Sequence, residues 1–240
     1  NWNYLDTAGF ARGAGGPSQD TLNQGNVNGH NWIPAECDVS IRPGWFWHAS
    51  EDSKVRSPQN LFDLYLKSVG RGANLLLNVP PNRKGLISAE DSIALAGFKT
   101  LRDEGFAANL LKQARSYYEF TDRDISSNQL QLRVLDPAST AYSVNLQNFV
   151  MELPSPTKMN CIILREAIHL GQSIRKFRIE LFNGKNKVGE LNGTTIGHKR
   201  IMTFPAQTIT SFRVHTEDRG GNDNITGVAA YLLPDELVEK

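Results

Sequence analysis

The order of strand and helix patterns in the first half of the chain restricts its fold more than any other feature. Apolar residues at 39–41 suit a short buried strand, and a helical pattern follows Ser57. A continuous apolar run at 75–79 predicts a strand buried on both faces, and a second helical pattern begins after Ser88. Strand, helix, strand, helix is the repeating unit of a parallel α/β fold. A complete (β/α)8 barrel takes roughly 250 residues, so this region can supply only its closing part.

Both helical patterns begin with a clear capping signal. Ser57 is a candidate N-cap and is followed by Pro58 at the first helical position. Ser88 caps the second helix, and Asp91, three residues on, would complete a variant of the capping box before the helix ends near Gly105. The predicted apolar faces consist of Leu61, Leu64, Tyr65 and Ser68 in the first helix, and Ile93, Leu95, Phe98 and Leu101 in the second.

The character of the sequence changes after Lys112. Apolar and polar residues alternate in short segments separated by turn residues, which predicts an antiparallel β-sandwich. The expected fold class is therefore α/β plus β, with the closing part of a (β/α)8-type barrel at 1–112 followed by the sandwich at 113–240. The predicted strands are 161–164, 177–182, 200–204, 212–215 and 228–232, and the predicted turns are Asn183-Gly184, Asn192-Gly193 and Gly220-Gly221.

Composition argues against several classes of partner. A chain of 240 residues with net charge +1 and scattered Lys and Arg lacks the concentrated basic surface that binds nucleic acid. No apolar run approaches the length of about 18 residues that spans a bilayer. Cys37 and Cys161 fit neither a disulfide framework nor a zinc site, and the histidines lack metal-binding spacing. We therefore expect no nucleic acid, membrane span, metal or cofactor.

Glu36 is the strongest candidate for a catalytic residue. It follows a Gly- and Asn-rich segment at 1–31 that is predicted to be irregular, and it lies between Trp32 and the aromatic stretch 45–48. Sugars stack on aromatic rings while charged groups bind their hydroxyls, so this setting suits carbohydrate chemistry. From the residues alone, the alternative is a structural ion pair between Glu36 and Arg42.

Asp38 is a second carboxylate close to Glu36. In an extended backbone the two side chains lie on one face, roughly 7 Å apart, a separation found in glycosidase carboxylate pairs. Catalytic residues of barrels usually come from different strands, however. Asp38 is therefore expected to cap a turn or to pair with Arg42 or Arg56.

Three ordered segments resemble glycoside hydrolase family 29 α-L-fucosidases. The segment 32–48, WIPAECDVSIRPGWFWH, resembles the part of that family in which a Glu is the general acid/base. The segment 68–81, SVGRGANLLLNVPP, is similar to the family's last barrel strand, and 82–87 to the segment after it. Later, 164–172 and 193–200 resemble the C-terminal, galactose-binding-like domain of plant and Bacteroidetes-type members. The resemblance covers nearly the whole chain.

The resemblance implies a retaining, exo-acting hydrolase that removes terminal α-L-fucose from oligosaccharides or glycoconjugates. Glu36 would be the general acid/base, Trp45 and Trp32 would stack against sugar rings, and His48 would bind a hydroxyl group. The family's nucleophile is an Asp in a Trp-x-Asp-Gly context, which this chain lacks. An upstream N-terminal part of the catalytic domain is therefore an expected partner.

Two further expectations concern the setting of the protein. Fucosylated glycans occur outside the cytoplasm, which favours a periplasmic, secreted or lysosome- or vacuole-like location. The alternative function is a non-catalytic carbohydrate-binding or scaffolding module with a vestigial barrel part. Against this alternative, all four tryptophans lie at or before Trp47, so the predicted sandwich contains none.

Overall fold

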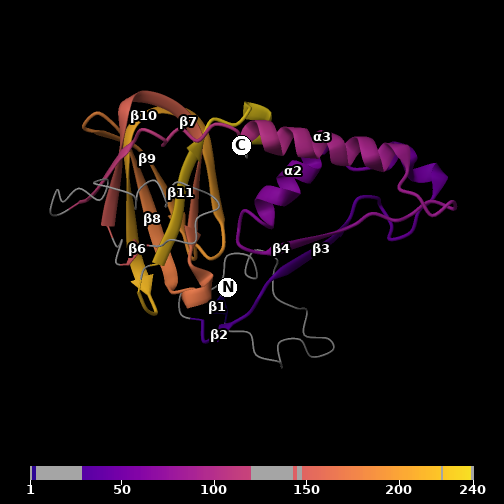
Figure 1. Ribbon diagram of the computed structural model, residues 1–240, viewed down its shortest axis with the longest axis horizontal. Helices are drawn as coiled ribbons and strands as arrows, with labels where there is room; N and C mark the ends of the chain where they lie inside the picture. The colour runs from indigo at the N-terminus through magenta and orange to yellow at the C-terminus, as the bar shows by residue number, and fades with distance from the viewer. Residues whose placement is uncertain (1, 4–28, 120–142, 145–147, 223, 239–240) are drawn as a thin grey trace.

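The structure is mostly β-sheet with few helices (Figure 1). Most of the Gly- and Asn-rich segment predicted to be irregular lies outside the described residues. Its two ends form β1 (Trp2–Asn3) and β2 (Asn31–Trp32), which pair antiparallel. The computed structural model describes residues 2–3, 29–119, 143–144, 148–222 and 224–238.

A pair of parallel strands and two helices follow β2. The strands are β3 (Glu36–Ser40) and β4 (Asn74–Asn78), which pair over their full length. A short 3-10 helix, η2 (Ala49–Lys54), and α2 (Pro58–Lys67) connect them, and α3 (Ala89–Gly105) follows β4. The predicted order of strand, helix, strand and helix is confirmed.

The parallel pair is covered on one face only. Ile41, Leu61 and Ala94 form a buried cluster against which Leu77 of β4 packs, so both helices lie on this face. Leu76, which points the other way, is 49% exposed. The prediction of a strand buried on both faces is therefore wrong within the described residues. Two parallel strands with helices on one side do not make a closed barrel.

Both predicted N-caps are confirmed, but the capping box predicted at Ser88 does not form. Ser57 Oγ accepts a hydrogen bond from the backbone N of Asn60 at 3.2 Å, and Ser88 Oγ accepts one from Asp91 N at 3.3 Å. The Asp91 carboxylate does not complete the predicted capping box, because it binds the guanidinium of Arg42 instead. A long-range ion pair has replaced the local bond.

The predicted helix faces are only partly correct. In α2, Leu61 is buried as predicted, but Phe62 and Leu66 are buried too, while Tyr65 is half-buried. In α3, the predicted core residue Ile93 is 71% exposed. The additional buried residues of α2 arise because this helix has two apolar contacts, one with the parallel strands and one with the antiparallel sheet beside it (Figure 1). The second contact consists of Phe62, Leu66, Cys161, Ile163, Ile201, Tyr231, Leu233 and Leu237.

The rest of the described chain forms one antiparallel sheet. Its strand order is β6-β11-β7-β10-β8-β9, and β5 also pairs with β7. Short 3-10 helices, η3 (Ile168–Leu170) and η4 (Asp235–Leu237), flank the later strands. The strands are β5 (Arg115–Tyr118), β6 (Ser143–Val144), β7 (Asn148–Glu166), β8 (Ile174–Asn183), β9 (Asn186–Gly193), β10 (Arg200–Arg219) and β11 (Asn224–Tyr231).

The two longest strands, β7 and β10, are interrupted at prolines. Pro154 and Pro156 lie where β7 loses its register with β10, and Pro205 lies in a second break within β10. Proline lacks an N–H to donate to the ladder and is tolerated in strands at such irregularities. The predicted strands 200–204 and 212–215 are therefore two parts of one strand.

The predicted turns have different outcomes. Asn183-Gly184 joins β8 to β9 with Gly184 at a φ of 60°, and Gly220-Gly221 lies between β10 and β11. Asn192-Gly193 is not a turn, because both residues belong to β9. A Cβ atom on Gly193 would lie 2.3 Å from the ring of Phe177. This glycine therefore permits close packing instead of a reversal.

A large core lies inside the part of the antiparallel sheet that the structure describes. Phe149 and Met151, before the break in β7, share this core with Ile162 and Leu164, which follow it. The breaks thus let one continuous sheet fold around its own apolar side chains.

Glu166, at the end of β7, joins three backbone segments. Its Oε1 accepts hydrogen bonds from the backbone N of Ser173 (2.9 Å) and Ile174 (3.0 Å), and its Oε2 accepts one from Gly197 N (2.7 Å). Burial raises the pKa of Glu166, while these donors oppose the rise. The side chain is buried, so its bonds are shielded from water.

Replacing Glu166 by Gln is expected to destabilise the fold. The new amide group faces a backbone N–H, so at least one buried donor loses its acceptor, at a cost of about 1–3 kcal/mol. Chemical denaturation of the complete protein measures this loss. Glu152→Gln, an exposed change on the same strand, is the matched control and should leave stability unchanged. Equal stability of both variants would contradict the prediction.

Candidate functional site

Glu36 is the first residue of β3, and its side chain is exposed. Its Oε2 accepts a hydrogen bond of 2.8 Å from Asn74 Nδ2. Asn74 is the first residue of β4 and lies opposite Glu36 in the parallel register. Asp38 is exposed on the same face, and Cys37 between them is buried. Glu36 is thus a solvent-accessible carboxylate with one oxygen held by an amide, an arrangement that leaves the other oxygen open to exchange a proton.

Arg42 is buried and forms an ion pair that the sequence did not predict. Its Nε lies 3.0 Å from both carboxylate oxygens of Asp91, and its Nη2 lies 2.8 Å from Ser88 Oγ and 2.9 Å from Asp52 Oδ1. The side chains of Arg42 and Asp91 have no exposed surface. Burial acts to lower the pKa of Arg42, but the two carboxylates raise it above its ordinary value. Arg42 therefore ties β3 to the start of α3.

The alternative partners predicted for the carboxylates of β3 are wrong. Arg42 pairs with neither Glu36 nor Asp38, because its donors are directed to Asp91, Asp52, Ser88 and the His48 carbonyl. Arg56 does not pair with Asp38 either. Its Nε donates to the Ser40 carbonyl at 2.9 Å, and its Nη1 donates to Asn60 Oδ1 at 2.8 Å.

Trp32 is linked to the antiparallel sheet. Its indole Nε1 donates a hydrogen bond of 2.9 Å to Gln172 Oε1. Gln172 is buried between η3 and β8, whereas Trp32 is 47% exposed. The sheet therefore sets the orientation of an aromatic side chain that precedes Glu36 by four residues.

Trp45 and His48 lie beyond the other end of β3. Asn78 Nδ2 donates to Ser40 Oγ and to the Trp45 carbonyl, both at 3.0 Å, which holds the loop after β3 against the end of β4. Trp45 is 51% exposed. His48 is exposed and occupies the N-cap position of η2, where its side chain makes no capping hydrogen bond.

The four predicted site residues are divided between the two ends of β3. Glu36 is the first of the five residues of β3, and the four steps from Glu36 to Ser40, which precedes the loop that holds Trp45, span roughly 13 Å. Glu36 and Trp32 are therefore at the amino end, while Trp45 and His48 are at the carboxyl end. The structure does not bring these four side chains together around one point.

Sequence reasoning missed three residues that position the candidates: Asn74, Gln172 and Asn78. The predicted strands at 39–41 and 75–79 could not indicate Asn74 or Asn78, because only the structure gives the register that places these residues opposite Glu36 and Ser40. No local signal indicates Gln172, since its partner Trp32 is 140 residues away.

Within the described ranges, the structure contains no group of three or more His, Cys, Asp or Glu side chains placed to hold a metal ion. Across the same residues, no helix combines the length and apolar character needed to cross a membrane.

Comparison with known proteins identifies the family. Residues 14–99 match the family model described as alpha-L-fucosidase. Over 190 residues, 75% of the chain, the sequence is 40% identical to alpha-L-fucosidase 1 of Arabidopsis thaliana. The chain belongs to the α-L-fucosidase family. The match takes in 37% of the Arabidopsis protein, so the chain spans little more than a third of this relative's length.

Solved structures from the fucosidase family share the fold of the chain. The crystal structure of SpGH29 is 30% identical, with a TM-score of 0.78 over 97% of this chain and 51% of that one. A Ruminococcus gnavus GH29 fucosidase, solved in complex with fucose, is 25% identical, with a TM-score of 0.69 over 90% of this chain and 44% of that one. The likeness thus includes the antiparallel sheet as well as the fucosidase segment at 14–99.

Proposed function

We propose that the complete protein is a retaining α-L-fucosidase that removes terminal α-L-fucose from oligosaccharides or glycoconjugates. The 40% identity to a plant α-L-fucosidase over 190 residues is the observation that supports this most strongly. The proposal places the enzyme outside the cytoplasm, in a periplasmic, secreted or lysosome- or vacuole-like setting where fucosylated glycans are met.

The proposal divides the chain at residue 112. Residues 1–112 would be the closing part of a (β/α)8-like barrel, and 113–240 a galactose-binding-like β-sandwich. Parallel strands with helices on one face support the first assignment, and a sheet folded around one core supports the second. The half-exposed Leu76 would be covered by an upstream N-terminal part of the catalytic domain, which would also supply the nucleophilic Asp.

In the proposed mechanism, Glu36 acts twice. The upstream Asp attacks the anomeric carbon while protonated Glu36 donates its proton to the departing glycosidic oxygen. Glu36, now a carboxylate, then takes a proton from the water that hydrolyses the glycosyl-enzyme. Solvent exposure of Glu36 and the Asn74 amide on Oε2 support this role, because they leave Oε1 free to transfer the proton.

One geometric observation opposes the assignment of Glu36. Catalytic residues of (β/α)8 barrels lie at the carboxyl ends of the strands, whereas Glu36 begins β3. The backbone of Glu36 lies roughly 13 Å along the strand from that of Ser40, after which the loop with Trp45 begins. We therefore assign Trp32 to the sugars next to Glu36, and Trp45 and His48 to a different part of the glycan. Substitutions of Glu36 at one end of β3, and of Trp45 and His48 beyond the other, test whether the catalytic site lies at the amino or the carboxyl end of the strand.

Fucose release by the complete protein tests the proposed function. We expect it to release L-fucose from fucosylated oligosaccharides and from an aryl α-L-fucoside, with the α anomer as the first product in an NMR time course. A β anomer would refute retention. Glycan binding without turnover by the complete protein would instead support the alternative of a non-catalytic carbohydrate-binding or scaffolding module.

A further inference from the structure

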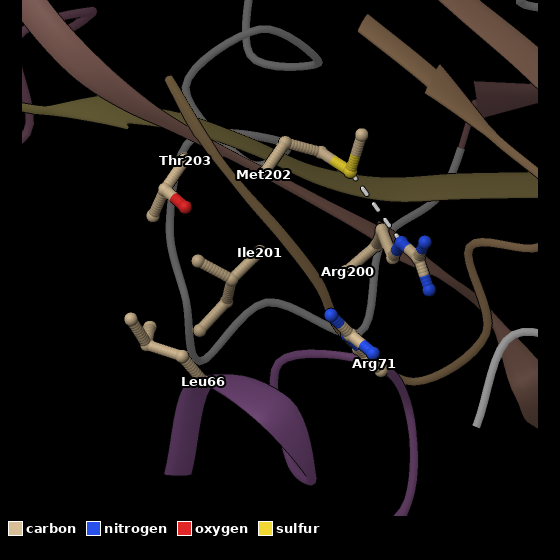
Figure 2. Close-up of a pocket in the computed structure, with 6 residues that line it drawn as sticks. All are labelled: Leu66, Arg71, Arg200, Ile201, Met202 and Thr203. Carbon is tan, nitrogen blue, oxygen red and sulfur yellow. Dashed lines mark hydrogen bonds between the residues drawn. The ribbon is translucent and has the colours of Figure 1, made fainter. Parts of the chain in front are cut away.

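A cavity of about 140 Å³ lies where the end of α2 meets the beginning of β10 (Figure 2). Arg71 and Arg200 lie on one side of it, and the apolar Leu66 and Ile201 lie on the other. A water molecule occupies about 30 Å³ of liquid, so the cavity has room for a small polyatomic group. The lining residues are Leu66, Arg71, Arg200, Ile201, Met202 and Thr203.

The backbone itself holds the two arginines together. Arg71 and Arg200 are partners in an antiparallel bridge, and the backbone N of Ile201 donates to the Gly70 carbonyl at 2.6 Å. A Cβ atom at Gly70 would lie 2.3 Å from the Leu66 carbonyl oxygen and 3.1 Å from Ile201 Cβ, so a glycine here relieves crowding from both the end of α2 and the start of β10. Like charges placed directly opposite on paired strands are destabilising. The fold therefore maintains an unfavourable pair of cations at the edge of the cavity.

Arg200 is a buried cation with an unsatisfied donor. Only 5% of the surface of Arg200 is exposed. Its Nε donates to Met202 Sδ at 3.4 Å, and its buried Nη1 has no hydrogen-bond partner. Burial and the neighbouring Arg71 lower the pKa of Arg200 to about 10, so the guanidinium remains protonated at neutral pH. A buried charge without a partner is costly. A negatively charged group in the cavity would remove that cost.

We propose that this cavity binds an oxyanion, either a sulfate or phosphate group or the carboxylate of a small ligand. Such groups present two oxygens to the fork of a guanidinium and form short, charge-assisted hydrogen bonds. In the proposed complex, Arg200 donates to the anion through Nη1, and Arg71 adds positive charge from the opposite strand. The site is separate from Glu36 and does not depend on the proposed fucosidase activity.

Thermal unfolding of the complete protein tests the oxyanion site. At constant ionic strength, replacing chloride by 10 mM sulfate is expected to raise Tm by roughly 2–4 °C. Parallel series in phosphate and acetate distinguish a tetrahedral from a planar anion. Arg200→Met should abolish the shift, and Arg200→Lys, which keeps the charge but loses the fork, should reduce it. Arg83→Met, which removes an exposed charge elsewhere, should retain the full shift.

Stability without the anion supplies the second readout. In chloride, Arg200→Met should have an unchanged or higher Tm, because methionine removes an unpaired buried charge. The proposal is overturned if no oxyanion raises the Tm of the unmodified protein, or if the shift persists in Arg200→Met. It is equally overturned if Arg200→Met unfolds or loses stability in chloride, since the guanidinium would then have a carboxylate partner within the protein itself.

Discussion

Replacing Glu36 by Ala in the complete enzyme is expected to lower turnover of natural fucosylated oligosaccharides by roughly 10²–10⁴-fold, the usual contribution of general acid–base catalysis. The natural leaving group is a poor one and needs the proton that Glu36 donates. An aryl α-L-fucoside with an activated leaving group needs that proton less, so its glycosylation step should be affected less. Azide should then partly restore turnover of the aryl substrate, because it attacks the glycosyl-enzyme without a general base.

Two sets of controls make the Glu36 experiment decisive. Asp38→Asn removes an exposed carboxylate from the same face of β3 and should leave kcat unchanged. Trp45→Ala and His48→Ala, at the other end of β3, should affect KM more than kcat. If Glu36→Ala keeps full activity on the natural substrate while changes at Trp45 or His48 lower kcat, the acid/base assignment is wrong. The catalytic end of the strands would then be the carboxyl end.

The second large effect is expected at the buried ion pair between β3 and α3. Asp91→Ala should lower the free energy of unfolding by about 3 kcal/mol, because it leaves the guanidinium of Arg42 buried without its main partner. Both side chains are fully buried, and Asp91 contacts Arg42 Nε with both oxygens at 3.0 Å. Denaturant unfolding of the complete protein, monitored by tryptophan fluorescence, measures the change.

A matched control uses the second carboxylate on the same guanidinium. Asp52 lies 2.9 Å from Arg42 Nη2, but its side chain is 34% exposed. Asp52→Asn should therefore cost less than Asp91→Ala, because part of the Asp52 side chain remains in contact with water. Equal losses for Asp91→Ala and Asp52→Asn would show that burial does not distinguish the two carboxylates, which would contradict the prediction.

Local sequence determined the features that depend on neighbouring residues. Ser57 and Ser88 cap the two helices as predicted, since a cap requires only a side-chain oxygen and a backbone N–H three residues on. The Asn183-Gly184 turn also follows from local backbone preference, because Gly184 adopts a positive φ. The three family segments are equally local, and all of them lie within the range that matches the α-L-fucosidase family.

Tertiary structure alone decided the partners of charged and aromatic side chains. Arg42 had several carboxylates within reach by sequence, and its choice of Asp91 depends on how α3 packs against β3. The bond from Trp32 to Gln172 joins residues 140 positions apart. No short-range pattern specifies such contacts, because they depend on the relative placement of whole elements.

The same distinction applies to the candidate site and to the cavity. Sequence placed Glu36, Trp45 and His48 in one short segment, but an extended strand separates residues that a compact loop would bring together. Conversely, Arg71 and Arg200 are far apart in the chain, and a backbone bridge makes them neighbours. Sequence determined the family and the local elements of this protein, whereas strand pairing and helix packing decided which side chains meet, because only they bring distant segments into contact.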